Sequence, residues 1–251
     1  MITSTQNKIV IYFVLTILLS LLLQIFQESY DFENFVYLAQ IIPGLIAVIM
    51  MFSFEETGVG SGMIVRRIIP TAKLKPIFLF IALLPLIIFP LSFYVFKISY
   101  NPVVNPVELS VFALIWPIIG AFSEELGWRG FLLNKAGTVM HMVFATLLTG
   151  VMWFFGRAYL FIDDIFLGIT YLFLFVEINF ILSYLFFMFN RSILLTFLFH
   201  LAYSYMFLFF TAKVHDDERF VFIQIVLFAI PTLIIVLKNK SLFQINRDDD
   251  I

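Results

Sequence analysis

Two adjacent glutamates and an arginine lie within an otherwise apolar stretch of the sequence. Glu124, Glu125 and Arg129 fall inside residues 120–131, Gly-Ala-Phe-Ser-Glu-Glu-Leu-Gly-Trp-Arg-Gly-Phe. An ionisable side chain in a membrane segment costs several kcal/mol unless it is paired or hydrated, so such residues usually mark a functional site. On a helix, Glu125 and Arg129 can form an ion pair because they are four residues apart. Glu124 is rotated by about 100° and faces a different neighbour.

This arrangement allows a catalytic and a structural interpretation. If Arg129 holds Glu125, then Glu124 is a free carboxylate in apolar surroundings and can take a proton from water as a general base. The structural alternative is an ion pair that holds helices together, with Glu124 protonated or hydrogen-bonded. Two carboxylates and one cation leave the charge unbalanced, which slightly favours the catalytic interpretation.

Other polar residues within apolar segments are few. His200 lies near the middle of one segment, with Ser204 one helical turn later. A lone histidine there is usually a packing residue, but beside a glutamate it is a candidate base, oxyanion donor or metal ligand. Arg157 ends another segment after an aromatic run, a pattern typical of an interfacial anchor. Glu177 lies close to Asn179 in a further segment. It is expected either to form a structural hydrogen bond or to be part of a functional site.

Composition places the chain in a membrane. Its 251 residues are 62% hydrophobic and 13% charged, with 34 Phe, too little polar surface for a soluble domain. We expect an all-α polytopic membrane protein in contact with the lipid bilayer. A net charge of -2 without a basic stripe argues against a nucleic-acid partner. The absence of cysteine excludes disulfides, thiolate catalysis and cysteine-type zinc sites.

About eight segments are long and apolar enough to be transmembrane helices, and no repeat or linker divides them. We therefore expect a single domain over residues 1–251. Pro43-Gly44 should break the second segment, and Pro85 and Pro90 should kink the third. The expected spans are residues 9–26, 35–54, 74–96, 107–133, 140–159, 165–189, 193–210 and 220–237.

The charges between these segments predict the orientation. The second connection carries Arg66 and Arg67, the tail begins with Lys238 and Lys240, and basic connections broadly alternate with acidic or mixed ones. The positive-inside rule then places both termini in the cytoplasm of a multi-pass cell-membrane protein. No small-residue cleavage site follows the first segment, so we expect a retained span and not a removed signal peptide.

The run from Glu124 to Arg129 resembles the Glu-Glu-x-x-x-Arg motif of the CAAX protease and bacteriocin-processing family, also called the Abi family. Its members are intramembrane endopeptidases with eight spans. The resemblance implies that Glu124 activates water and that Glu125 and Arg129 support it. It also implies a bacterial plasma membrane as the location and a motif core at about residues 107–211.

Two further family motifs have counterparts in this chain. The second is an aromatic residue followed four positions later by histidine. The stretch from Trp153 to Arg157 resembles it, with Trp153 in the aromatic position and Arg157 where the histidine is expected. The third is a histidine followed four positions later by a small polar residue, and it is similar to His200 and Ser204. The departure is Arg157, because an arginine stays protonated and can neither act as a base nor bind zinc. It could still stabilise an oxyanion, or it could neutralise Glu124.

The sequence therefore leaves two functions open. The first is an intramembrane endopeptidase for a peptide such as a bacteriocin or signalling precursor. In it, Glu124 is the base, and His200, with Arg157 and Ser204, holds the oxyanion. The second is a catalytically silent relative that acts as a membrane scaffold, binds a partner protein or confers bacteriocin self-immunity. A transporter is a weaker third possibility, because no paired repeats with broken helices are present.

Metal chemistry is not expected. Glu124, Glu125 and His200 offer too few nitrogen ligands for a tetrahedral zinc site. We predict no cofactor. If a divalent metal is nevertheless present, Glu124 and His200 would bind it.

Overall fold

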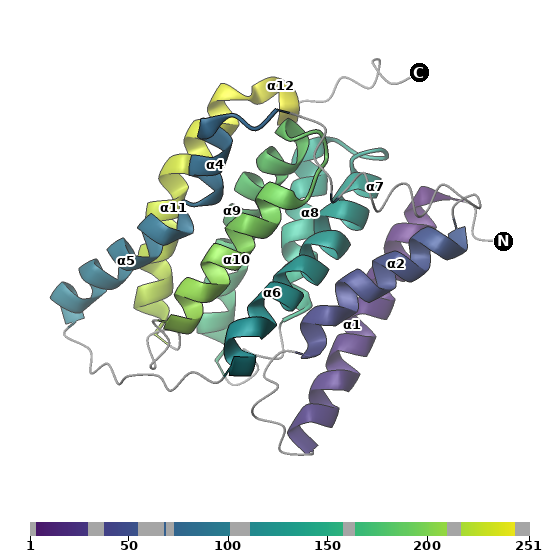
Figure 1. Cartoon of the computed structure of the whole chain (residues 1–251), viewed down its shortest axis with the longest axis horizontal. Helices are drawn as coiled ribbons and strands as arrows, with labels where there is room; N and C mark the ends of the chain where they lie inside the picture. The colour runs from purple at the N-terminus through teal and green to yellow at the C-terminus, as the bar shows by residue number, and fades with distance from the viewer. Residues whose placement is uncertain are drawn as a thin grey trace.

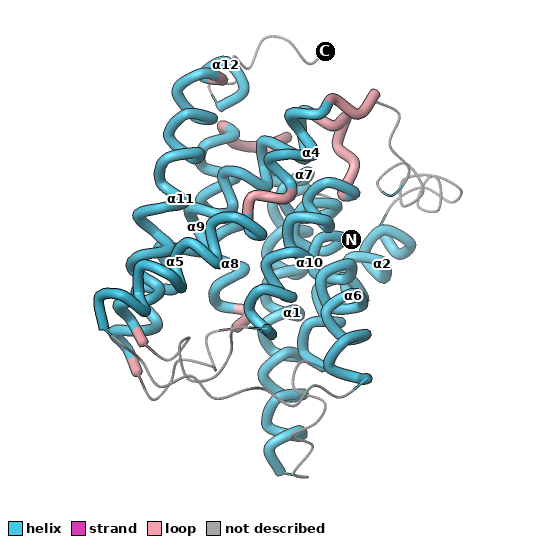
Figure 2. Tube along the Cα trace, turned by 60° about the vertical axis from the view of Figure 1, so that its left-hand side comes forward, coloured by secondary structure: helices cyan, strands magenta, loops and turns pink. Residues whose placement is uncertain are grey.

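All regular structure in the described part of the chain is helical. The computed structural model describes residues 4–29, 38–54, 68, 73–100, 111–157, 164–209 and 217–243, and these contain helices and no strand (Figure 2). The prediction of an all-α fold is therefore confirmed. The elements are α1 (Thr5–Ser29), the 3₁₀ turn η2 (Leu38–Ile41), α2 (Ile42–Phe54), α4 (Pro76–Ala82), α5 (Pro85–Tyr100), α6 (Val111–Glu125), η3 (Leu126–Leu133), α7 (Asn134–Ala136), α8 (Met142–Phe155), α9 (Ile165–Met188), α10 (Leu194–Phe209), α11 (Glu218–Lys238) and α12 (Lys240–Phe243).

The long helices pack side by side in one bundle (Figure 1). α1 and α2 form one flank, and α4, α5 and α11 form the other. Between them lie α6, α8, α9 and α10. The start of α1 and the end of α11 both lie in the upper half of the bundle as drawn in Figure 1.

Several of these helices are suited to a bilayer. Among the described residues, α1, α9 and α11 are each long and apolar enough to cross a membrane, and α4 with α5 forms a fourth candidate span bent by 40°. The apolar helices α8 and α10 and the segment Leu38–Ser53 are shorter. Large apolar side chains such as Ile98 and Phe166 are exposed on the outside of the bundle. The chain is thus a multi-pass membrane protein whose outer surface contacts lipid.

Proline residues shape two spans close to the predicted positions. Pro43 lies in the first turn of α2, directly after η2, where its missing N–H leaves no helical bond unmade. The predicted kink in the third span is a break, because α4 ends at Ala82 and α5 begins at Pro85. Pro90 lies inside α5.

The fourth predicted span is not a uniform α-helix. After α6, residues Leu126–Leu133 form the π-helix η3, and all eight are buried. Residues 107–110 of the predicted span lie outside the described residues. A π-helix is rare and is found mostly as a short widened turn at functional sites. Here the widened turn begins directly after Glu124 and Glu125.

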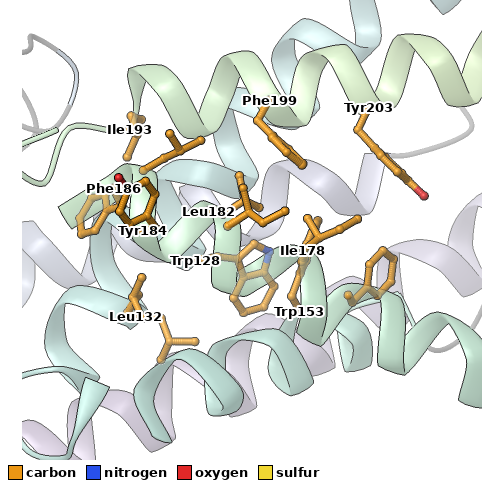
Figure 3. Close-up of a cluster of buried hydrophobic side chains, with 14 of the residues drawn as sticks. Trp128, Leu132, Trp153, Ile178, Leu182, Tyr184, Phe186, Ile193, Phe199 and Tyr203 are labelled. Carbon is orange, nitrogen blue, oxygen red and sulfur yellow. The ribbon is translucent and has the colours of Figure 1, made fainter. Parts of the chain in front are cut away.

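The centre of the bundle is apolar and closely packed. Trp128 of η3, Ile178 and Leu182 of α9 and Phe199 of α10 belong to one buried cluster and point toward a shared centre (Figure 3). Such packing excludes water from the interior, so polar groups there must find partners within the protein.

Candidate active site

The two glutamates lie where α6 meets η3, inside the bundle. Glu124 exposes 2% of its surface and Glu125 exposes none. A neighbouring helix covers this junction closely because η3 contains glycine. A Cβ placed on Gly127 would lie 2.5 Å from the carbonyl carbon of Pro43 in α2. The glycine therefore allows α2 to shield the carboxylates on that side.

Glu125 binds two side chains through one oxygen. Nη1 of Arg129 donates to Oε1 at 2.8 Å, which confirms the predicted pair four residues apart. Nδ1 of His200 lies 2.8 Å from the same oxygen. Since the carboxylate oxygen accepts, this geometry requires that His200 carry a proton on Nδ1.

Arg129 is fully buried and connects three elements. Its Nη2 donates to Oδ1 of Asn179 at 2.6 Å, and Nδ2 of Asn179 donates to the backbone oxygen of Thr146 at 2.5 Å. The guanidinium carbon also lies 4.5 Å from the ring centroid of Trp153. Arg129 therefore links η3 with α8 and α9 as well as holding Glu125.

Glu124 is bound by two residues at the end of α8. Arg157 donates from Nη2 to Oε1 at 2.8 Å and to Oε2 at 2.9 Å, and from Nε to Oε1 at 3.2 Å. Trp153 donates from Nε1 to Oε2 at 2.7 Å. Nε2 of His200 lies 3.6 Å from Oε2, slightly beyond hydrogen-bond distance. Glu124 is therefore not free, and Arg157 points into the bundle and is not an interfacial anchor.

The charges of this cluster balance. The sequence suggested two carboxylates with one cation, but Arg157 supplies a second guanidinium, so two anions meet two cations when His200 is neutral. Buried ions are tolerated when each is paired and hydrogen-bonded. The cluster is therefore compatible with the apolar interior around it.

A small cavity adjoins Glu124. Its volume of about 10 Å³ is roughly the room that one water molecule needs. Of the residues that line it, Trp128 has a buried Nε1 without a hydrogen-bond partner, and Glu124 supplies carboxylate oxygens. Space together with unused polar atoms is the condition under which buried water is bound. The cavity is lined by Ala39, Gln40, Pro43, Glu124, Trp128, Trp153, Gly156 and Arg157.

The structure brings five of the six predicted site residues together, and Ser204 stays apart. Ser204 is half-buried one turn beyond His200 on α10, and it has no hydrogen bond to the other five among the described residues. Sequence reasoning missed that Asn179 accepts a hydrogen bond from Arg129. Its only signal was an amide in the middle of an apolar segment. Trp153 was noted only as an aromatic residue, whereas its N–H is what contacts Glu124.

The geometry around Glu124 is ill suited to a cation. Among the described residues, no group of three or more His, Cys, Asp or Glu side chains is arranged to hold a metal ion. A divalent ion between Glu124 and His200 would also face the guanidinium of Arg157 and the N–H of Trp153.

Comparison with known proteins identifies relatives of this region. Residues 106–206 match the family described as type II CAAX prenyl endopeptidase Rce1-like. Lysostaphin resistance protein A of Staphylococcus aureus (strain bovine RF122 / ET3-1) is 29% identical over 151 residues, which are 58% of this chain and 36% of that protein. The protein of the same name from strain MRSA252 is 28% identical over 173 residues, 66% of this chain and 41% of that protein. The chain thus spans about two fifths of the length of these relatives.

Proposed function

We propose that the chain is an intramembrane endopeptidase in which Glu124 activates water, because residues 106–206 match the family described as type II CAAX prenyl endopeptidase Rce1-like. The observation that carries this proposal is room for one water beside a buried carboxylate that has positive neighbours. A carboxylate so placed can take a proton from the attacking water. Nearby N–H donors can stabilise the negative charge that develops on the peptide carbonyl oxygen.

The proposed reaction assigns a step to each part of the cluster. The water oxygen bonds to the carbonyl carbon as its proton passes to Glu124, and that proton then moves to the leaving amide nitrogen as the C–N bond breaks. Arg157, the more exposed donor, turns from Glu124 toward the oxyanion. Nε2 of His200 lies 3.6 Å from Oε2 of Glu124 and donates to the oxyanion only when the imidazole carries a second proton. Glu125 and Arg129 position His200 through Nδ1.

The substrate and the setting follow from the membrane context. We propose a peptide inserted in or lying against the membrane, such as a bacteriocin or signalling precursor, as the family resemblance suggests. In this proposal the chain is one domain that crosses the cell membrane of a bacterium eight times, with both termini in the cytoplasm. The described parts of the eight expected spans are helical, and of these helices α1, α9, α11 and the bent pair of α4 and α5 are long and apolar enough to cross a membrane.

We propose that hydrolysis needs no metal ion. The oxygens of Glu124 already accept bonds from Arg157 and Trp153, and these positive donors occupy the positions that a cation would take. Dialysis against a strong chelator should leave the cleavage rate unchanged, and elemental analysis should find no stoichiometric zinc. One bound zinc per chain that disappears in His200→Ala would overturn this.

Cleavage by the purified protein tests the proposal. The protein in lipid vesicles is incubated with a panel of membrane-spanning precursor peptides, and products are identified by mass spectrometry. Glu124→Gln should lose cleavage by about 100-fold or more, the usual contribution of a general base. Glu218→Gln, which changes an exposed glutamate at the start of α11, should cleave like the wild type. Equal cleavage by Glu124→Gln and wild type would remove Glu124 from the mechanism.

A catalytically silent protein is the second candidate, and one observation favours it. Arg157 contacts both oxygens of Glu124, which satisfies the carboxylate without any substrate. The relatives named above are called lysostaphin resistance proteins, so a resistance or self-immunity role, or that of a membrane scaffold, fits the same geometry. In that case no panel peptide is cleaved, and Glu124→Gln keeps the protective phenotype in cells.

A further inference from the structure

Glu177 lies in the middle of a candidate span and outside the active-site cluster. It is twelve residues after Ile165 and eleven before Met188, which are the ends of α9. A span of this length places Glu177 near the centre of the hydrocarbon core, about 15 Å from either surface.

The side chain belongs to the outward stripe of α9. Ile169 and Phe173, eight and four residues earlier, are 47% and 62% exposed. Ile178, the next residue, is 1% exposed and points into the core in Figure 3. Helical periodicity places Glu177 in line with Ile169 and Phe173, and its side chain is half-buried. The outward stripe is hereafter Ile169, Phe173 and Glu177.

The carboxyl group has no partner among the described residues. Its Oε2 is buried without a hydrogen bond, and no ion pair includes it. A charged residue at the centre of a span is costly, and such residues almost always pair inside the bundle. Asn179, a polar residue two positions later, does have a partner inside the bundle, because its Oδ1 accepts a hydrogen bond from Arg129. Among the described residues, Glu177 therefore makes neither the structural hydrogen bond nor the contact with the site that the sequence left open.

The outward stripe faces the lipid side, from which a partner at the same depth can approach Glu177. Lipid headgroups lie too far away, because hydrocarbon separates them from the bilayer centre. A second copy of the chain is poorly suited. Arg129, Arg157 and His200 are engaged with Glu124 and Glu125. The other basic residues of its described helices, such as Lys8, Lys97 and Arg219, lie within four residues of a helix end and so away from the bilayer centre. With headgroups and a second copy set aside, the occupant that complements the charge of Glu177 is a helix of another membrane protein. That helix would carry an arginine or lysine near its middle.

We propose that the outward stripe is a docking site for a transmembrane helix of a partner membrane protein, with Glu177 paired to an arginine or lysine of that helix. Ile169 and Phe173 pack against its apolar side chains, and the ion pair sets its depth. When the partner helix docks, its cation takes the place of lipid beside the carboxylate and stabilises the charged form of Glu177. The site is independent of hydrolysis, so it holds for an active and for a silent protein.

Association with designed helices tests this site. The full-length protein, labelled with a fluorescence acceptor, is placed in phosphatidylcholine vesicles with a donor-labelled leucine-rich helix of about 20 residues. One helix carries a central arginine and its match carries a central leucine. We expect wild type to bind the arginine helix about tenfold more tightly, as one interhelical polar contact allows. The preference should vanish in Glu177→Leu and persist in the matched control Glu218→Gln.

Three results would overturn the proposal. Equal binding of both helices by the wild type would show that Glu177 faces lipid as a neutral carboxyl. A preference that survives Glu177→Leu would place the arginine elsewhere on the bundle. Self-association of the wild type that Glu177→Leu abolishes would make the partner a second copy. Thermal unfolding of each variant in micelles confirms that the fold is intact before binding is compared.

Discussion

Arg157 and Trp153 both donate to Glu124, but they do so from different surroundings. The side chain of Arg157 is 19% exposed, whereas Trp153 is 3% exposed and stacks on Phe175 with the ring centroids 4.7 Å apart. The guanidinium can therefore move without disturbing the core, and the indole cannot. We interpret Trp153 as the donor that holds the carboxylate in place, and Arg157 as the group that can turn toward a substrate.

The first prediction concerns the tryptophan bond. Trp153→Phe keeps the aromatic stacking but removes the only donor to Glu124 that comes from a fully packed side chain. The free energy of unfolding should fall by about 1.5–3 kcal/mol, the usual contribution of a hydrogen bond to a charged group. Denaturant unfolding in micelles measures this.

Trp128→Phe is the matched control for that change. Trp128 is equally buried, but its Nε1 has no partner, so the same substitution removes no hydrogen bond. The difference between the two variants isolates the bond to Glu124. Equal losses of stability in both would show that this bond contributes nothing measurable.

The second prediction concerns Asn179. Asn179→Leu keeps the volume but removes the acceptor for Nη2 of Arg129, leaving a buried guanidinium with Glu125 as its remaining hydrogen-bond acceptor. We expect a loss of about 1.5–3 kcal/mol, typical of a hydrogen bond to a charged group. Ser183→Ala is the control, because Ser183 is buried on the same helix and its hydroxyl has no partner. A stability loss no larger than that of the control would contradict a role in holding Arg129.

At the scale of helices, the sequence predicted the features that depend on residues close together in the chain. Apolar runs indicated the helices, and the four-residue spacing of Glu125 and Arg129 predicted their pair, which the structure confirms. The π-helix η3 was missed because no single residue signals a widened turn. The hydrogen bond that Asn179 accepts from Arg129 was missed because the two residues are far apart in the sequence.

The third prediction concerns the contact between α2 and η3. Gly127→Ala would place a Cβ 2.5 Å from the backbone of Pro43, which cannot move aside like a flexible side chain. Overpacking of this kind costs about 1–3 kcal/mol and should also displace the glutamates that precede η3. Thermal unfolding and the cleavage assay should both show a loss.

Gly130→Ala is the control for this contact. Its Cβ would meet only the end of the Leu126 side chain, at 3.3 Å, which can give way. Alanine also favours helix more than glycine does, so stability should stay equal or rise slightly. Similar losses in the two variants would indicate that helical geometry, and not the approach of α2, makes position 127 sensitive.

At the scale of the whole molecule, the shorter helices carry the polar groups. α8, with Trp153, has 14 residues and α10, with His200, has 16. At 1.5 Å per residue they are about 21–24 Å long, less than the usual 30 Å of hydrocarbon. A bilayer thins beside short spans. Thinning beside α8 and α10 would shorten the distance from water to the cavity beside Glu124, while the long helices α1, α9 and α11 hold the bundle in the membrane.

The last prediction concerns the orientation of this bundle. The chain has no cysteine, so single cysteines report accessibility without background. Ser4→Cys and Ser241→Cys are exposed positions near the two ends of the chain, and Glu218→Cys lies at the start of α11, at the opposite end of the bundle. With eight crossings and both termini in the cytoplasm, a membrane-impermeant maleimide should label only Glu218→Cys in intact cells. Ser4→Cys and Ser241→Cys should react only after lysis. Labelling of just one of these two in intact cells would place the ends on opposite sides, which requires an odd number of crossings.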